Sequence, residues 1–378
     1  MLKQNKAIEL RLYPNKEQQV LLNKTFGCVR KVYNLALAEC IDSYKETKLF
    51  NHSNYPTYVE QYNYLDAVEK QALCQSLNDL HTAFKNRFSK TSKKQSGFPK
   101  FKSKKSRQSY RTCQPSKNAL GEHTLKLPKI GKVRFKAKPK VGADWKLKSI
   151  TISMSATGKY HASLLYEFYV EEPNKKLDVN NSIGLDYSSH DFYVDNQGIK
   201  ANYPKFYRVY EHKLAREQRK LSHCKKGSNN YCKQKHKVAL VHEKIANCRK
   251  DFCHKLARQL SNQYDYIFVE DIDLKAISQS LKLGKSTLDN GFGMFRNILN
   301  YKLSEQGKKL VVIDKWTPTS TVCSNCGTYH KDIVNSLAIR EWVCPDCETK
   351  HDRDINAAKN IRSVGIKTVG TTGLACVC

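Results

Sequence analysis

Two cysteine pairs near the C-terminus constrain the fold more than any other feature of the sequence. Cys323-Ser-Asn-Cys326 and Cys344-Pro-Asp-Cys347 are C-x-x-C motifs separated by seventeen residues. A two-residue spacer lets both thiolates of a turn face one ion, and a second turn completes the tetrahedral set that zinc prefers. A redox dithiol and coincidence are the alternatives. We predict a structural zinc site with four cysteine ligands, which leaves no position for a catalytic water.

The other ten cysteines show no motif spacing, and we expect them to be reduced thiols. The N-terminal stretch MLKQNKAIELRLYP alternates polar and apolar residues and lacks the apolar centre of a signal peptide. No stretch approaches the roughly 20 apolar residues that span a bilayer. We therefore expect a cytoplasmic protein with no membrane partner.

The charge balance indicates the class of partner. The chain of 378 residues carries 66 Lys and Arg against 35 Asp and Glu, a net charge of +31. Such an excess favours a polyanion, most simply a nucleic acid, with an anionic membrane surface as the alternative. The length allows two or three domains with hydrophobic cores of their own.

One segment concentrates this charge. Between Asp79 and Glu122 there are twelve Lys or Arg residues and no acid, and five aromatic residues are interleaved with them. A solvated linker would explain the cations but not the aromatic rings, whereas a nucleic-acid backbone and its bases suit both. A packed and charged protein surface is the alternative. The candidate nucleic-acid contacts in this segment and in the helices before it are Arg30, Lys31, Lys85, Arg87, Phe98, Lys100, Phe101, Lys102, Lys104 and Lys105.

The first half of the chain predicts strands separated by helices. Residues 7–14 alternate in the manner of a strand, and Asn15 with Gln18 resembles a helix N-cap. Helical spacing of apolar residues follows it and recurs over about 65–90. Short alternating stretches between about 123 and 172 predict a small antiparallel barrel or sheet, which the first strand can join.

The second half predicts an α/β core. SIGLD and FYVDNQG indicate the two strands of a hairpin, and residues 205–260 indicate a helix pair that turns at KKGSNN. YDYIFVED and KKLVVID predict short buried strands on either side of a further helix. Strands that alternate with helices are typical of an α/β fold.

Three acids stand at the ends of predicted elements. Asp186 and Glu270 each follow a buried strand, and Asp354 precedes the helical pattern INAAKNI. Singly, each is well explained as a turn residue or a helix cap. Together they would form an oxygen-rich cluster of the kind magnesium prefers, in which two ions about 3.5–4 Å apart could act on a phosphodiester. This combination is typical of a ribonuclease-H-like nuclease.

A family resemblance unites these features. The stretches FGCVRKVYNLALA, GFPKFKSKK, IGLD, FVEDIDL, TPTSTVCSNCG, WVCPDC and HDRDINAAKNI occur in this order and together resemble the TnpB family of transposon-encoded RNA-guided nucleases. The resemblance covers about residues 6–366. It implies a multidomain α+β fold in which a wedge β-barrel carries an inserted helical recognition lobe. A RuvC nuclease domain of ribonuclease-H-like α/β fold follows, with an inserted zinc ribbon.

The resemblance also implies domain bounds and site residues. Asp186, Glu270 and Asp354 match the catalytic acids, which bind two magnesium ions per active site. Asp352 is the second choice for the third acid. The four motif cysteines match the zinc ligands, and Arg296 matches a segment that can contact nucleic acid or simply cover a helix surface. The implied domains are a wedge barrel (1–13 and 108–177), a recognition lobe (14–107), a RuvC domain (178–317 and 351–366), a zinc ribbon (318–350) and a tail (367–378).

The function that the resemblance implies is RNA-guided cleavage of double-stranded DNA beside a short flanking motif. Guide RNA and target DNA are then the partners, and the protein would work in a prokaryotic cytoplasm and on the nucleoid when bound to DNA. A guide-dependent DNA-binding protein without cleavage and a CRISPR-associated compact type V effector are the alternatives. An unguided transposase is less favoured, because no tyrosine or serine constellation for strand transfer is evident.

Overall fold

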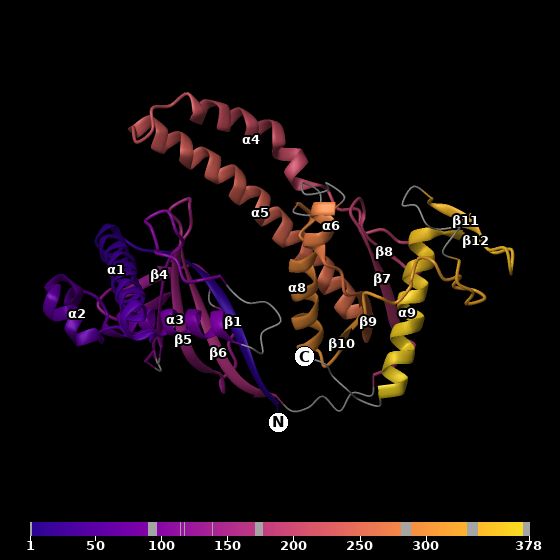
Figure 1. Ribbon diagram of the computed structural model, residues 1–378, viewed down its shortest axis with the longest axis horizontal. Coiled ribbons are helices and arrows are strands. Elements are labelled where there is room, and N and C mark those ends of the chain that lie inside the picture. The colour runs from indigo at the N-terminus through magenta and orange to yellow at the C-terminus, as the bar shows by residue number, and fades with distance from the viewer. Residues whose placement is uncertain are drawn as a thin grey trace. The chain divides into compact units, whose positions relative to one another are not determined.

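The computed structural model describes residues 2–89, 97–113, 115–116, 118–137, 139–170, 177–280, 289–330 and 339–372. Parts of the expected recognition lobe (90–96), nuclease domain (281–288) and zinc ribbon (331–338) lie outside the described residues, as does the end of the tail (373–378). The chain divides into two compact units, Met1–Glu171 and Glu172–Cys378, and each contains a sheet of its own (Figure 1).

The first unit is built on a six-stranded antiparallel sheet in the order β2-β5-β6-β1-β4-β3. β1 pairs with β6 along its length and with β4 at its end, so the first strand joins the later ones as predicted. Among the described strands, no pairing between β2 and β3 closes the sheet into a barrel. The strands are β1 (Leu2–Tyr13), β2 (Gln108–Cys113), β3 (Thr124–Leu127), β4 (Gly131–Phe135), β5 (Lys146–Met154) and β6 (Tyr160–Val170).

Helices inserted between β1 and β2 pack together and against β2. The predicted cap is confirmed, because the backbone N–H of Gln18 donates to the Asn15 side chain and the Gln18 side chain accepts from the Asn15 N–H. Apolar residues at helical spacing, such as Leu22 and Phe26, are buried in the core of this unit. The helices are α1 (Lys16–Thr47), α2 (Tyr55–Gln61), the short 3₁₀ helix η1 (Asn63–Ala67) and α3 (Lys70–Phe88).

The second unit contains a four-stranded sheet in the order β10-β9-β7-β8. β9 runs parallel to both β7 and β10, whereas β7 and β8 form the predicted antiparallel hairpin. The expectation that KKLVVID is a buried strand was wrong, because β10 is an edge strand on which Val312 is 43% exposed. The strands are β7 (Ser182–Ser188), β8 (Phe192–Asp195), β9 (Tyr266–Glu270) and β10 (Lys309–Ile313).

Helices cover both faces of this second sheet. Ile267 and Val269 of β9 pack into a cluster with residues of α5 and α8, whereas Phe268 packs with Ile361 of α9. A two-stranded sheet of β11 (Glu341–Val343) and β12 (Lys350–Asp352) belongs to the segment that bears the cysteines. No described helix combines the length and hydrophobicity that a membrane span requires. The helices are α4 (Phe206–Ser222), α5 (Asn229–Gln263), α6 (Leu274–Ser280), α8 (Phe292–Ser304) and α9 (Arg353–Thr372).

Candidate active site and metal centre

Asp186 and Glu270 lie at the same end of β7 and β9, the two central strands of the second sheet. β7 and β9 are parallel, and the last paired residues in their register are Leu185 and Val269. The next residue on each strand is an acid, so both carboxyl groups leave the sheet at the same end. This placement follows from strand register, because residues at equivalent positions on two adjacent parallel strands lie close together. Both acids are only partly exposed.

Asp354 lies in the first turn of α9, which packs directly on β7. The contact is made through Gly184, where a Cβ atom would lie 2.2 Å from the carbonyl oxygen of Ala358. Arg362 then fastens the helix to the start of the strand, because its Nε donates to the carbonyl of Ser182 at 3.0 Å. These contacts bring the beginning of α9 to the strand end that carries Asp186.

The cap of α9 is Asp352 and not Asp354. Oδ1 of Asp352 accepts hydrogen bonds from the backbone N–H groups of Asp354 and Ile355, both at 3.0 Å. An acid that caps a helix in this way has its carboxylate engaged by the backbone. The carboxylate of Asp354 is instead paired with the guanidinium of Arg340, at 3.4 Å from Nη1 to each oxygen. The helix-cap explanation therefore applies to Asp352.

The three acids interact electrostatically. Burial, followed by repulsion from Asp354 and Glu270, raises the pKa of Asp186 well above its usual range, and Arg353 opposes this shift. Burial together with the neighbouring Asp271 raises the pKa of Glu270 to about 7. Carboxyl groups that repel one another in a partly dry site hold protons unless a cation neutralises them.

The spacing of these acids differs from that of a tight metal cage. Groups of three or more potential ligand atoms that all lie within 4.8 Å of one another occur, in the described part of the chain, in the cysteine-bearing segment. The oxygens of Asp186, Glu270 and Asp354 are therefore more widely spaced. The donor set is made of carboxylate oxygens, which suits a hard cation such as magnesium.

Arg296, the candidate nucleic-acid contact in α8, faces Asp271. Its Nη2 is 3.6 Å from Oδ1 of Asp271, the residue that follows Glu270. Arg296 is largely buried, with 22% of its side chain exposed, whereas 61% of the Asp271 side chain is exposed. The guanidinium is therefore paired with the residue that follows Glu270 in the chain.

The four motif cysteines converge as predicted. Their sulfur atoms all lie within 4.8 Å of one another, and Sγ of Cys323 is 3.6 Å from Sγ of Cys347. Sγ of Cys326 is also 3.6 Å from Sγ of Cys344. A disulfide would need about 2.05 Å, whereas a tetrahedral zinc with Zn–S bonds of about 2.3 Å separates its sulfurs by about 3.8 Å. The arrangement therefore fits a zinc ion.

The surroundings of these thiols shift their pKa values in opposite directions. The hydroxyl and backbone of Thr349 lower the pKa of Cys347 to about 6, whereas burial raises the pKa of Cys344 to about 12. Two histidines, which the sequence did not predict as neighbours of the cysteines, contact sulfur atoms. Nε2 of His351 lies 3.0 Å from Sγ of Cys323, and Nε2 of His330 lies 3.2 Å from Sγ of Cys344. Neighbours of this kind orient thiolates around a metal.

Two buried asparagines of α9 join the cysteine-bearing segment to the helix of Asp354. The Asn356 side chain donates to the carbonyl of Val322 and accepts from the N–H of Ser324, both at 2.8 Å, so it bonds both neighbours of Cys323. Nδ2 of Asn360 donates to the carbonyls of Thr319 and Val322. These two residues were not predicted from the sequence, in which their spacing of four on one helix face is the only signal.

The candidate contacts of the first unit differ in how far they are engaged within the protein. Arg30, Lys31 and Lys102 already have partners within the protein. Arg30 donates to Gln108 at 2.8 Å, and the ammonium groups of Lys31 and Lys102 lie over the rings of Tyr62 and Tyr33. Phe98 is 42% exposed but packs edge-on against Phe84. Arg87 is partly buried, whereas the exposed candidates are Lys85, Lys100, Phe101, Lys104 and Lys105.

Protein-family profiles match three parts of the chain. Residues 163–281 match a profile described as "Probable transposase", and residues 292–361 match "Cas12f1-like, TNB domain". Residues 1–48 match a profile described as "Helix-turn-helix domain", although here these residues form one strand and one long helix. The second profile contains the four cysteines, Asp354 and both asparagines.

Curated relatives match over nearly the whole chain. A protein of Streptomyces pristinaespiralis, provisionally named an RNA-guided DNA endonuclease, is 33% identical over 96% of this chain and 89% of its own. A protein of Escherichia coli (strain K12) with the same provisional name is 28% identical over 96% and 93%. A TnpB-like protein of Acanthamoeba polyphaga mimivirus is 30% identical over 58% of this chain and 44% of its own.

Among solved structures, a Cas12f1 complex with sgRNA and target DNA covers 95% of this chain at 16% identity and a TM-score of 0.48. That likeness is loose, and the sequence relationship is the stronger finding. A relative more than 30% identical spans almost the full length of both proteins, and a mimivirus relative bears the family name. The chain belongs to the TnpB family.

Proposed function

We propose that this protein is an RNA-guided DNA endonuclease. A bound guide RNA would pair with the target strand of double-stranded DNA, while the protein reads a short flanking motif and the shape of the heteroduplex. The proposal rests on the placement of Asp186 and Glu270 at the same end of two adjacent strands, close enough to Asp354 for the three to interact electrostatically. This acid cluster belongs to a chain of net charge +31. Two relatives that match almost end to end bear this activity in their provisional names.

Asp186, Glu270 and Asp354 are the residues that would hold magnesium. Support comes from their donor atoms, which are all carboxylate oxygens, and from the mutual repulsion that raises the pKa of Asp186. When bound, a pair of magnesium ions stabilises the attacking and leaving oxygens of a phosphodiester. The wide spacing of the three acids is compatible with two ions about 3.5–4 Å apart. Glu270 and Asp186 must lose their protons before they can serve as ligands.

The cysteine site would be structural. Four thiolates complete the coordination of zinc and leave no open position. Asn356 and Asn360 connect this site to α9 through backbone hydrogen bonds. The zinc would therefore stabilise the cysteine-bearing segment, which is bonded to the first turns of α9. By holding the start of α9, this segment would also hold Asp354 in position.

We further propose the domain bounds that the family resemblance implies. The wedge domain would comprise 1–13 and 108–177, which the pairing of β1 with β6 supports. Residues 14–107 would form the recognition lobe, and its exposed cations and ring at Lys85, Lys100, Phe101, Lys104 and Lys105 are its favoured nucleic-acid contacts. The RuvC domain would comprise 178–317 and 351–366, with the zinc ribbon (318–350) inserted and the tail (367–378) following.

The proposal is tested with the protein purified together with its RNA. Asp186→Ala should abolish magnesium-dependent cleavage of a DNA that matches the guide and carries the flanking motif, while RNA affinity stays within about twofold. Cleavage by this variant at the wild-type rate would refute the assignment. A wild-type protein that binds matched DNA without cutting it would be a guided DNA-binding protein instead. Sequencing the RNA distinguishes a transposon-end guide from a CRISPR array.

A further inference from the structure

The α4–α5 arm of the second unit is a basic feature separate from the acid site. Between residues 206 and 263 there are fifteen Lys and Arg against four Asp and Glu. The two helices pack on each other (Figure 1). They share a small core of their own around Leu214, Val241 and Ile245. Their outer surface is therefore free to carry charge without a role in the main core.

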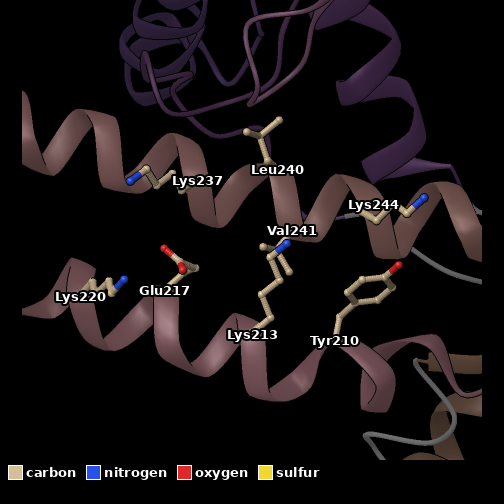
Figure 2. Close-up of a pocket in the computed structure, with 8 residues that line it drawn as sticks. All are labelled: Tyr210, Lys213, Glu217, Lys220, Lys237, Leu240, Val241 and Lys244. Carbon is tan, nitrogen blue, oxygen red and sulfur yellow. The ribbon is translucent and has the colours of Figure 1, made fainter.

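A groove of about 280 Å³ lies between the two helices (Figure 2). Apolar side chains of α5 and one tyrosine of α4 contribute to its lining, and lysines from both helices border it. The volume is slightly below the roughly 300–1,000 Å³ of ordinary ligand pockets, so the groove suits one nucleotide-sized group and not a duplex. The lining residues are Tyr210, Lys213, Glu217, Lys220, Lys237, Leu240, Val241 and Lys244.

The cations of the groove are available to a ligand. Lys213, Lys237 and Lys244 are exposed, and none of them forms an ion pair within 4.0 Å in the described part of the chain. The one acid of the groove, Glu217, is buried and already engaged. Nε2 of Gln234 donates to its Oε2 at 2.7 Å, and this bond lowers the pKa of Glu217.

A second basic hollow adjoins the groove. It has a volume of about 370 Å³, shares Lys213 with the groove and is otherwise lined by His212, Arg216 and Arg219. The two hollows share a lysine, and each is lined by cations. Together they can hold successive phosphates of one strand. The arm therefore offers a track for a phosphate backbone with a partly apolar recess beside it.

We propose that this groove binds an unpaired nucleotide of a structured RNA, an inference that rests on the proposed RNA-guided function. The base would lie against Tyr210 and Leu240, while Lys213, Lys237 and Lys244 contact the flanking phosphates. RNA recognition targets bulges and loops whose bases can be unstacked. Proteins that hold single strands without base preference use several stacking rings along an open groove, whereas this groove has one aromatic residue in a discrete recess.

The test compares lysines on opposite sides of one helix. Lys237 borders the groove, whereas Lys235 is exposed but lies about 200° away around the helix at roughly 100° per residue. The probe is the RNA that copurifies with the wild-type protein, transcribed and labelled. Lys237→Glu should weaken RNA binding at least about tenfold. The slope of log K against log salt concentration should become shallower by roughly 0.7 or more, the value for one phosphate contact on a single strand. The matched variant Lys235→Glu should bind RNA within about twofold of wild type.

Tyr210→Ala separates stacking from charge. It should weaken RNA binding by about fivefold or more with an unchanged salt dependence, because stacking on an aromatic ring is worth roughly 1–3 kcal/mol per base. Ultraviolet crosslinking should place Tyr210 on one unpaired nucleotide of the RNA. Crosslinks spread over paired regions would contradict a single-nucleotide recess.

Three outcomes would overturn the inference. Equal losses for Lys237→Glu and Lys235→Glu would mean that only the general charge matters. Unchanged RNA binding by Lys237→Glu would exclude the groove as an RNA site. Normal RNA binding with weaker target binding by the RNA-loaded variant would assign the groove to DNA. Failure of the proposed function is distinct, because a wild-type protein that never cleaves matched DNA would still give the RNA-binding contrast.

Discussion

Gly184 of β7 and Ala358 of α9 are in direct backbone contact. A Cβ atom on Gly184 would lie 2.2 Å from the carbonyl oxygen of Ala358, closer than real Cβ atoms approach other atoms. Gly184 precedes Asp186 by two residues, and Ala358 follows Asp354 by about one helical turn. The contact therefore determines how near the third acid comes to the first.

Gly184→Ala should displace α9, because the added methyl group meets backbone that cannot rotate away. Overpacking of this kind costs about 1–3 kcal/mol or more, and cleavage should fall at least about tenfold. Gly370→Ala is the matched control. Gly370 lies in α9, and no atom lies within 4 Å of the position that its Cβ would take. Denaturant unfolding and a cleavage assay check both variants. Equal behaviour of the two would contradict the close contact.

Asp352 and Asp354 should respond differently to mutation. Asp352→Ala removes the cap of α9 and should lower the free energy of unfolding by about 1 kcal/mol, with cleavage retained in part. Asp354→Asn keeps the volume and should leave stability nearly unchanged, but it should abolish cleavage by removing a carboxylate from the acid cluster. Thermal unfolding and single-turnover cleavage separate the two roles. Full activity of Asp354→Asn would move the third acid to Asp352.

Asn356→Ala should loosen the cysteine site without touching a thiol. The substitution leaves the N–H of Ser324 and the carbonyl of Val322 without their partner, and each unsatisfied buried group costs about 1–3 kcal/mol. Zinc should then transfer to a chromogenic chelator several times faster than from wild type, and cleavage should fall. Asn356→Asp keeps the acceptor but loses the donor, so its rate of zinc release should lie between those of wild type and Asn356→Ala. Wild-type zinc release from Asn356→Ala would show that the hydrogen bonds do not couple the helix to the metal site.

Glu270 should make the metal-free protein less stable as pH rises. Its pKa is raised from 4.5 in the unfolded chain to about 7 in the folded one, so between these values the folded state holds a proton that the unfolded state has lost. The stability that this proton provides is complete below the lower value and is lost as pH rises through the upper one. The melting temperature of wild type relative to Glu270→Gln should therefore fall between about pH 5 and pH 8. A parallel pH dependence of the two proteins would exclude the shift.

The residues of the site differ in how far the sequence could predict them. The cysteine cluster could be predicted directly, because ligand spacing within a turn is a local property. Asp186, Glu270 and Asp354 had only weak local signals, and the resemblance to a family selected them. The nucleic-acid candidates were harder, since charge alone does not reveal that Arg30 bonds Gln108 or that Lys102 lies over Tyr33.

Elements were predicted more reliably than their surroundings. The hairpin of β7 and β8, the helix pair from residue 206 to residue 263 and the cap at Asn15 follow from periodicity and capping patterns. The burial of β10 was predicted wrongly, because an apolar strand looks the same in the middle of a sheet and at its edge. The groove between α4 and α5 was not predicted, since it depends on which faces of the two helices meet.

The sequence by itself determined the motif cysteines, the basic character of the chain and most of its helices and strands. These features depend on residues within a turn or two of one another, where spacing and composition are sufficient. Only the tertiary structure decided that Asp186 and Glu270 are neighbours, that Asp352 rather than Asp354 caps α9, and that Asn356 holds both neighbours of Cys323. Strand register and close backbone packing set those relationships, and both arise from contacts between residues far apart in the chain.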